Sequence, residues 1–187
     1  MKAANTQAEP VIILLVEDEP AHAEIVRRNL ADHRMANRPV QLVHVSDGQQ
    51  ALDYLFRQGE FQDPSRSPRP HLILLDLRLP KVDGLEVLKI VKKDADLSSI
   101  PVIVLTTSSA GVDIVKAYGN HANSYLVKPV DFSQFRKLMD AIGFYWLVWN
   151  QSSDCHGNTE AGSGKQFTEM EAANSPQPQS INRPQKK

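Results

Sequence analysis

The chain has 187 residues, of which 41% are hydrophobic and 23% charged, a composition typical of one soluble domain with some chain to spare. Its 21 basic and 22 acidic residues give a net charge of −1, which provides no reason to expect binding to nucleic acid or to an anionic membrane. The single cysteine excludes an internal disulfide, the first ten residues lack the apolar stretch of a signal peptide, and no apolar run is long enough to span a bilayer. We therefore expect a cytoplasmic protein without nucleic-acid or membrane partners.

Five short apolar segments are predicted to be strands. They span residues 11–16, 40–45, 72–75, 100–105 and 124–127. Three of them are continuous runs rich in Val, Ile and Leu that show no alternation with polar residues. This pattern is typical of strands that are buried on both faces, as in a parallel sheet covered by helices.

Helical patterns separate the predicted strands. Apolar residues recur on one helix face within 51–56 and within 85–91. A first-turn proline or a capping side chain predicts helix starts at Pro20, Ser46, Asp83 and Asp131. The order strand then helix, repeated five times, favours an α/β fold with a parallel sheet covered by helices on both sides.

Two stretches lie outside this repeat. Residues 59–70 form a polar loop with several prolines, which is long for a connection in this architecture. From Asn150 onward the chain is rich in Ser, Gln, Asn, Gly and Pro and has almost no aliphatic residues, which predicts disorder. The expected organisation is a disordered N-terminus at 1–9, one domain at 10–149 and a disordered tail at 150–187.

Polar residues stand at the carboxyl ends of four predicted strands. They are Glu17, Asp18, Asp76, Thr106 and Lys128. Because the carboxyl ends of parallel strands share one edge of a sheet, we expect these residues to meet in one pocket. Three clustered carboxylates repel one another unless a cation lies between them, and oxygen ligands without His or Cys favour Mg²⁺ over zinc.

The lysine and the threonine indicate what the pocket binds. An ammonium and a hydroxyl beside a metal-bound carboxylate can hold a phosphoryl group, and an aspartate can accept that group as an acyl phosphate. Asp76 is the central candidate because it follows the middle strand. Each residue alone has an ordinary explanation, as a solvated strand end, a helix-terminus charge or a cap. The complete set is what indicates the chemistry.

Four segments resemble the motifs of the CheY-like receiver domains of two-component response regulators. They are VEDEP (16–20), LLDLRLPKVDG (74–84), VLTTS (104–108) and VKP (127–129), and the resemblance covers about residues 10–148. It implies an α/β fold of the flavodoxin-like type, a doubly wound sandwich of three layers with a parallel sheet of order 2-1-3-4-5. It also implies that Asp76 accepts a phosphoryl group from a phosphohistidine of a sensor histidine kinase. It also implies that Mg²⁺ is held by Glu17, Asp18, Asp76 and the backbone carbonyl of Arg78.

The resemblance further implies a switch. Lys128 would pair with the phosphoryl oxygens, Thr106 would donate its hydroxyl and move inward, and the aromatic ring of Tyr125 would change rotamer with it. The new negative charge would then change the face formed by the fourth helix, fifth strand and fifth helix. The family also implies a cis peptide before Pro129 that aims the lysine inward, the alternative being an ordinary trans turn.

Two residues near the phosphoacceptor depart from the family pattern. Arg78 places a long cation two residues after Asp76, and Thr107 adds bulk directly after Thr106. Our hypothesis is that both border the path of the hydrolytic water and set the lifetime of the acyl phosphate. If so, Arg78→Ala and Thr107→Ala should each change the dephosphorylation rate.

The last predicted helix carries an apolar seam that continues past the expected core. Phe135, Leu138 and Ile142 are expected to pack in the core. Aromatic residues follow at the end of the domain, where little core remains to cover them, and such residues often mark an interface. The candidate interface residues are Tyr145, Trp146 and Trp149.

The ending FYWL, the loop at 59–70 and the TTS run are similar to the small phytochrome-associated response regulators. These are single receivers found with bacterial and cyanobacterial phytochrome kinases. This resemblance implies a stand-alone receiver that signals as a homodimer through the face formed by the fourth helix, fifth strand and fifth helix. The expected partner is a sensor histidine kinase of the phytochrome type.

Alternative functions come from different classes. A signalling phosphoacceptor catalyses only its own phosphotransfer and dephosphorylation and is not a conventional enzyme. A pseudo-receiver would bind partners without phosphorylation, but the acid set is intact. A small phosphohydrolase would need a second acid two residues after Asp76, where Arg78 stands instead. A flavin or nucleotide binder would need a phosphate loop after the first strand, and VEDEP is acidic there.

Overall fold

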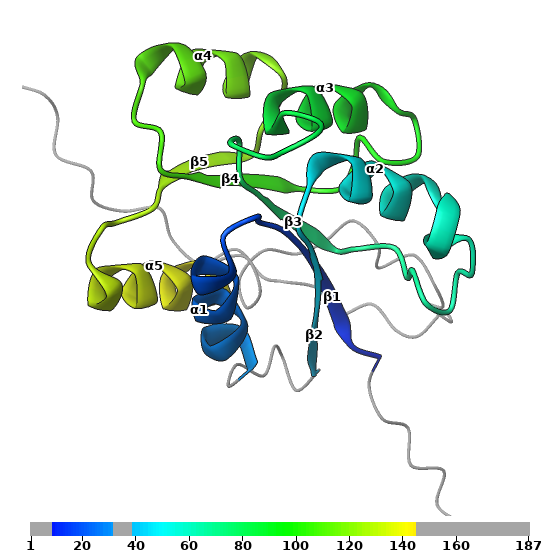
Figure 1. Cartoon of the computed structure of the whole chain (residues 1–187), viewed down its shortest axis with the longest axis horizontal. Helices are drawn as coiled ribbons and strands as arrows, with labels where there is room; N and C mark the ends of the chain where they lie inside the picture. Colours follow the sequence, from blue (N-terminus) through cyan, green and yellow to red (C-terminus); the bar gives the residue numbers. More distant parts are fainter. Residues whose placement is uncertain (1–8, 32–38, 145–187) are drawn as a thin grey trace, which may run out of the picture. The chain divides into compact units, whose positions relative to one another are not determined.

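A computed structural model of the protein describes residues 9–31 and 39–144, which belong to one compact unit, Met1–Ser152. The predicted flavodoxin-like α/β fold is confirmed, with a parallel sheet of order β2-β1-β3-β4-β5 (Figure 1). The elements in chain order are β1 Val11–Val16, α1 Pro20–Ala31, β2 Val40–Val45, α2 Gly48–Phe56, the 3₁₀ helix η1 Gly59–Phe61, β3 Leu72–Leu75, α3 Gly84–Lys93, β4 Val102–Thr106, α4 Gly111–Gly119, β5 Ser124–Val127 and α5 Phe132–Phe144.

The three central strands are apolar except for Thr106 at the end of β4, because helices cover both faces of the sheet. Every residue of β1, β3 and β4 is buried. Side chains alternate along a strand, so Leu14 and Val16 pack with α2, α3 and α4, whereas Ile13 and Leu15 pack with α1 and α5. Figure 1 shows the same division, with α2, α3 and α4 on one side of the sheet and α1 and α5 on the other.

Two elements have boundaries that differ from the predicted ones. Helix α2 is capped by Asp47, whose Oδ1 accepts a hydrogen bond from the backbone N–H of Gln50 (2.8 Å), and Ser46 lies outside it. Strand β4 begins at Val102 and not at Ile100, because Pro101 has no N–H to donate to the ladder. The predicted caps at Asp83 and Asp131 are confirmed by hydrogen bonds of 2.9 Å to backbone N–H groups of α3 and α5.

The strand register brings the candidate residues to one level of the sheet edge. Val16 pairs with Leu75, and Leu75 pairs with Val104. The ladder extends one residue further, because the Asp76 N–H donates to the Val16 carbonyl at 3.0 Å. The residue after β1, the residue after β3 and the end of β4 therefore lie side by side.

The long connection at 59–70 is held by the end of α2. The hydroxyl of Tyr54 donates to the carbonyl of Pro68 at 2.7 Å, and its ring meets the ring of Phe61 edge to face at 5.3 Å. Arg69 Nη1 donates to the carbonyl of Leu55 at 2.8 Å. Because Tyr54 is buried, these contacts attach the loop to the core of the domain.

Tyr54→Phe should cost about 1 kcal/mol of stability at neutral pH, because the Pro68 carbonyl loses its donor. Burial raises the pKa of Tyr54 to about 12 from 10.0. The wild type therefore keeps this contribution fully below pH 10.0 and loses about 3 kcal/mol as the pH rises through the folded value. Urea unfolding near neutral pH should show that Tyr54→Phe is less stable than the wild type, and above pH 10.0 this difference should shrink and then change sign. The control is Tyr118→Phe at an exposed position, which should not lower the stability at neutral pH.

The core prediction for the last helix is confirmed over its described part. Phe135 and Ile142 are buried in the cluster between α1, α5 and the sheet, and Leu138 packs against it. The candidate interface residues Tyr145, Trp146 and Trp149 lie outside the described residues, as does the tail at 150–187. Among the helices that the structure describes, none is long and apolar enough to cross a membrane.

Candidate functional site at the carboxyl edge of the sheet

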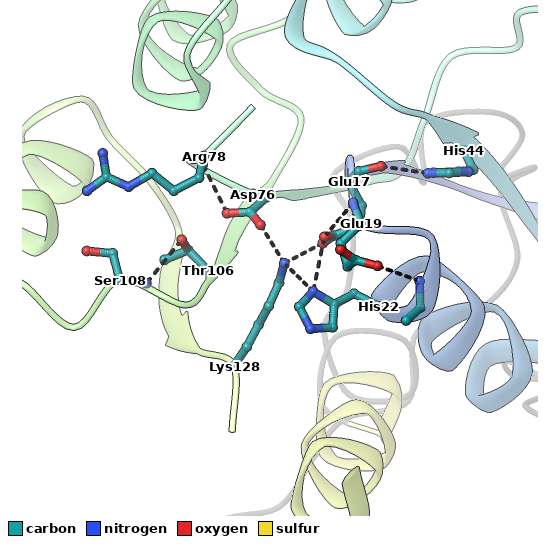
Figure 2. A network of polar contacts seen from close by, with 10 residues as sticks. Glu17, Glu19, His22, His44, Asp76, Arg78, Thr106, Ser108 and Lys128 are labelled. Carbon is teal, nitrogen blue, oxygen red and sulfur yellow. Dashed lines mark hydrogen bonds and ion pairs between the residues drawn. The ribbon is translucent and has the colours of Figure 1, made fainter. Parts of the chain in front are cut away.

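Three charged side chains predicted to converge form a buried cluster at the sheet edge. Glu17, Asp76 and Lys128 are 1%, 5% and 4% exposed. The Lys128 ammonium donates to Glu17 Oε2 and to Asp76 Oδ2, both at 2.5 Å (Figure 2). All three continue the strand faces that look toward α1 and α5, because side chains alternate along each strand. One ammonium therefore compensates two buried carboxylates.

Thr106 and Tyr125 lie on the opposite side of the sheet edge, toward α4. Thr106 is fully buried, and its Oγ1 accepts a hydrogen bond from the N–H of Ser108 at 3.3 Å. Among the hydrogen bonds described for these residues, none joins Thr106 to Asp76. The Tyr125 hydroxyl donates to the Ser108 carbonyl at 2.8 Å, and burial raises the pKa of this phenol. Both predicted switch residues thus contact the β4–α4 connection.

The acid cluster can hold a divalent cation. One carboxylate oxygen each from Glu17, Asp18 and Asp76 lies within 4.8 Å of the others, and Asp18 is exposed to solvent. The backbone of Arg78 adjoins them, because its N–H donates to Asp76 Oδ1 at 3.1 Å. The donor set consists of carboxylate oxygens, which suits a hard ion better than a soft one. The residues fit the ion that the sequence predicts.

His22 belongs to the cluster and was missed by the sequence analysis. Its Nδ1 lies 3.3 Å from Glu17 Oε1 and 3.4 Å from the Lys128 ammonium. Its ring meets Phe135 of α5 edge to face at 5.8 Å. The sequence feature that could have revealed it is its position one helical turn after Asp18, which places it on the face of α1 that points back to Glu17 and Asp18. His22 links the charged cluster to the packing of α1 against α5.

Glu17→Gln should stabilise the metal-free fold at neutral pH and weaken divalent cation binding about tenfold. Burial raises the pKa of Glu17 despite the attraction of Lys128, and the charge of Asp76 adds to the increase. An acid with a raised folded pKa loses stability as the pH rises above 4.5 through the folded value. Thermal unfolding with a chelator should therefore show a gain for Glu17→Gln at neutral pH that disappears near pH 4.5, and calorimetric titration gives the metal affinity.

The side chain of Arg78 points away from Asp76. Its Nη2 donates to Asp113 Oδ2 on α4 at 2.9 Å, and Figure 2 shows the guanidinium on the Ser108 side of Asp76. Ser108 Oγ donates to the same Asp113 oxygen at 2.6 Å. Thr107 is exposed. The sequence analysis did not anticipate Asp113, which has no spacing relation to the acid residues.

The connection between β3 and α3 is fixed by two glycines and an ion pair. The Lys81 ammonium lies 2.6 Å from Asp47 Oδ2, and Lys81 adopts a left-handed backbone with φ of 64°. A Cβ at Gly48 would stand 2.0 Å from the Val82 carbonyl oxygen, and a Cβ at Gly84 would stand 2.1 Å from the carbonyl oxygen of Asp76. These close approaches hold the segment that follows Asp76.

The peptide bond before Pro129 is trans, since the described residues contain no cis peptide, so the family expectation of a cis bond is wrong for this structure. Lys128 nevertheless points into the pocket. Its backbone N–H donates to the Thr106 carbonyl at 2.7 Å, which extends the β4–β5 ladder by one residue and sets the side-chain direction. The register of β5 is sufficient to aim the ammonium.

Known proteins resemble this chain in sequence. A model of the response regulator receiver domain matches residues 13–140. The probable methanogenesis regulatory protein FilR2 of Methanothrix harundinacea is 44% identical over 144 residues, which cover 77% of this chain and 88% of that protein. Response regulator Rcp1 of Synechocystis sp. is 42% identical over 138 residues, which cover 74% of this chain and 90% of Rcp1.

Solved structures agree with the sequence relatives. The Mn²⁺-bound form of Rcp1 superposes with a TM-score of 0.72 at 40% identity, covering 76% of this chain and 99% of that one. The phosphorylated cyanobacterial phytochrome response regulator RcpA also gives a TM-score of 0.72, at 39% identity over 78% of this chain and 99% of that one. The chain therefore belongs to the response regulator receiver domains of two-component signalling.

Proposed function

We propose that Asp76 is the phosphoacceptor of a two-component phosphorelay and takes its phosphoryl group from a phosphohistidine on a sensor histidine kinase. The observation that carries this proposal is the Asp76 carboxylate, buried at the sheet edge and held between the Lys128 ammonium and the Arg78 N–H. The relative RcpA, which is known in a phosphorylated form, supports it.

The contacts orient Asp76 for attack. The Arg78 N–H holds Oδ1 and the Lys128 ammonium holds Oδ2, so the carboxylate plane is fixed before a donor arrives. A carboxylate oxygen forms a bond to phosphorus while the bond from phosphorus to the imidazole nitrogen breaks, and the electron pair returns to the imidazole. Lys128 remains beside the transferred group and neutralises part of its charge, and the Thr106 hydroxyl is the expected second donor.

The ion proposed for this site is Mg²⁺, held by Glu17, Asp18, Asp76 and the backbone carbonyl of Arg78. When bound, it supplies positive charge against the phosphoryl oxygens. The oxygen-only ligand set supports a hard ion, and the relative Rcp1 is known in a Mn²⁺-bound form. Calorimetric titration should detect Mg²⁺ binding to the wild type and a large loss of affinity in Asp18→Asn, a solvent-exposed position where the fold should tolerate the change.

The proposed output surface is the face formed by α4, β5 and α5. Val112, Val115 and Tyr118 of α4 are 63%, 72% and 51% exposed, and Val127 of β5 is 41% exposed. Apolar side chains recurring every three residues on an exposed helix face suit a protein contact. A homodimer through this face, extended by Tyr145, Trp146 and Trp149, accounts for the surface.

Other properties of the chain follow as part of this proposal. Receiver domains are signalling proteins and not conventional enzymes, so the only catalysis proposed is self-catalysed phosphotransfer and dephosphorylation. The relatives associated with phytochromes support a phytochrome-type kinase as the partner. The proposed receiver spans residues 10–149, with residues 1–9 and 150–187 as flanking segments. We also propose a cytoplasmic location and no nucleic-acid or membrane partners.

The test is transfer from a kinase. A purified bacterial phytochrome histidine kinase, labelled on its histidine with radioactive ATP, should lose label to the wild-type chain and not to Asp76→Asn. Size-exclusion chromatography of both proteins should show a larger dimer fraction only in the phosphorylated wild type. A dimer of equal strength in both proteins, with no transfer of label, would favour a pseudo-receiver that binds partners without phosphorylation.

A further inference from the structure

Arg78 contacts two different parts of the molecule. Its backbone binds the proposed phosphoacceptor Asp76, and its guanidinium binds a residue of α4. Arg78 N–H donates to Asp76 Oδ1, while Arg78 Nη2 donates to Asp113 Oδ2 at 2.9 Å. The Arg78 side chain is 63% exposed and the Asp113 side chain 13% exposed. A solvent-exposed cation whose backbone contacts Asp76 is thus held by a largely buried carboxylate on another element.

Asp113 connects this cation to the switch residues. Its Oδ2 also accepts the hydroxyl of Ser108, whose carbonyl accepts the Tyr125 hydroxyl and whose N–H donates to Thr106 Oγ1. The connected groups come from the β3–α3 connection, the β4–α4 connection, the first turn of α4 and β5. Favourable placement of an acid at a helix N-terminus explains Asp113 within α4, but it does not explain the ion pair to a residue 35 positions away.

A phosphoryl group on Asp76 would compete with Asp113 for Arg78. It carries between about 1.5 and 2 negative charges and three acceptor oxygens, whereas Asp113 offers one charge, and arginine binds such groups through paired hydrogen bonds. Arg78 is two residues from Asp76 and its side chain is mostly exposed to solvent, so the side chain can change partner without unfolding the loop. When the Arg78 side chain leaves, the Asp113 carboxylate keeps only Ser108 among its described side-chain partners. The first turn of α4 is then held less firmly.

We propose that Asp113 restrains Arg78 in the unphosphorylated protein, and that phosphorylation moves the guanidinium from Asp113 to the phosphoryl group and so releases the first turn of α4. This inference rests on the proposed function of Asp76. It makes Asp113 a positioning residue that opposes phosphorylation, and Arg78 the group through which it acts. The exposed apolar residues Val112 and Val115 flank Asp113 on the same helix, so the released turn belongs to the proposed output face.

The test is a double-mutant cycle with beryllofluoride, which mimics a phosphoryl group on aspartate, in the presence of Mg²⁺. Asp113→Asn should raise beryllofluoride affinity about fivefold in the otherwise wild-type chain, because the ion pair no longer has to be broken. In an Arg78→Ala background, Asp113→Asn should have no effect, since the restrained group is absent. Glu86→Gln, which removes a carboxylate and its ion pair with Lys89 on α3, should leave affinity unchanged.

A second readout follows the released turn directly. Hydrogen exchange of the α4 amides near Asp113 should be faster in unliganded Asp113→Asn than in the wild type, and beryllofluoride should add little further change. An equal gain of affinity in both backgrounds would mean that only the lost negative charge matters and would overturn the inference. No gain in either background would also overturn it while leaving the proposed function intact, provided that the wild type binds beryllofluoride and Asp76→Asn does not. A wild type that fails to bind would overturn both.

Discussion

A Lys128→Met variant should lose about 3 kcal/mol of stability at neutral pH in the absence of divalent metal. The ammonium lies at 2.5 Å from both Glu17 and Asp76, and all three side chains are buried. Removing it leaves two adjacent carboxylates without a positive partner, and Glu17, whose pKa is already raised by burial, must take up a proton or repel Asp76. Methionine has a similar volume, so the packing around the stem is kept.

Urea unfolding with and without Mg²⁺ measures this effect. Mg²⁺ should restore much of the lost stability, because it supplies the positive charge that the carboxylates need, and the loss should be smaller at acidic pH. Lys89→Met is the matched control, since that ammonium pairs with Glu86 on the surface and its removal should change stability by no more than about 0.5 kcal/mol. Equal stabilities for the Lys128 variant and the wild type would contradict the electrostatic role of Lys128.

A Gly84→Ala variant should be destabilised by about 3 kcal/mol and should be phosphorylated slowly. The added Cβ would stand 2.1 Å from the Asp76 carbonyl oxygen and 2.7 Å from the Leu77 Cα, and backbone atoms cannot move aside as a flexible side chain can. The Gly84 N–H also donates to the Leu77 carbonyl at 3.0 Å, so relief of the clash breaks this bond. Asp76 must shift with the chain that carries it.

The control for this substitution is Gly119→Ala in α4. Nothing lies within 4 Å of a Cβ at Gly119, so alanine fits there and should stabilise the helix by up to about 1 kcal/mol. Thermal unfolding together with the rate of phosphate uptake from a small donor separates the two variants. If Gly84→Ala and Gly119→Ala were equally stable and took up phosphate at equal rates, the close approach of α3 to Asp76 would have no consequence.

Much of the fold and part of the site could be predicted because they depend on local patterns. Continuous apolar runs such as 72–75 occur where both faces of a strand are covered, and that pattern predicts a parallel sheet. Parallel strands share an edge, so Asp76 and Lys128 could be placed together although they are 52 residues apart. Their direction toward α1 and α5 follows from the strand register.

The remaining contacts depend on how helices pack, which sequence spacing does not specify. The ring of His22 meets Phe135 because α1 lies against α5, whereas its contact with Glu17 is local. Arg78 reaches Asp113 because α4 begins next to the β3–α3 connection. The cap of α2 is Asp47 and not the predicted Ser46. The Asp47 carboxylate also pairs with Lys81 of the β3–α3 connection, a partner that no local sequence pattern reveals.

The central claim is that Asp76 accepts a phosphoryl group, and intact mass measures this most directly. The purified protein is incubated with Mg²⁺ and acetyl phosphate, and its mass is compared with that of Asp76→Asn treated in the same way. The wild type should gain the mass of one phosphoryl group and the variant should gain none. An unchanged wild-type mass, or the same gain in Asp76→Asn, would contradict the claim.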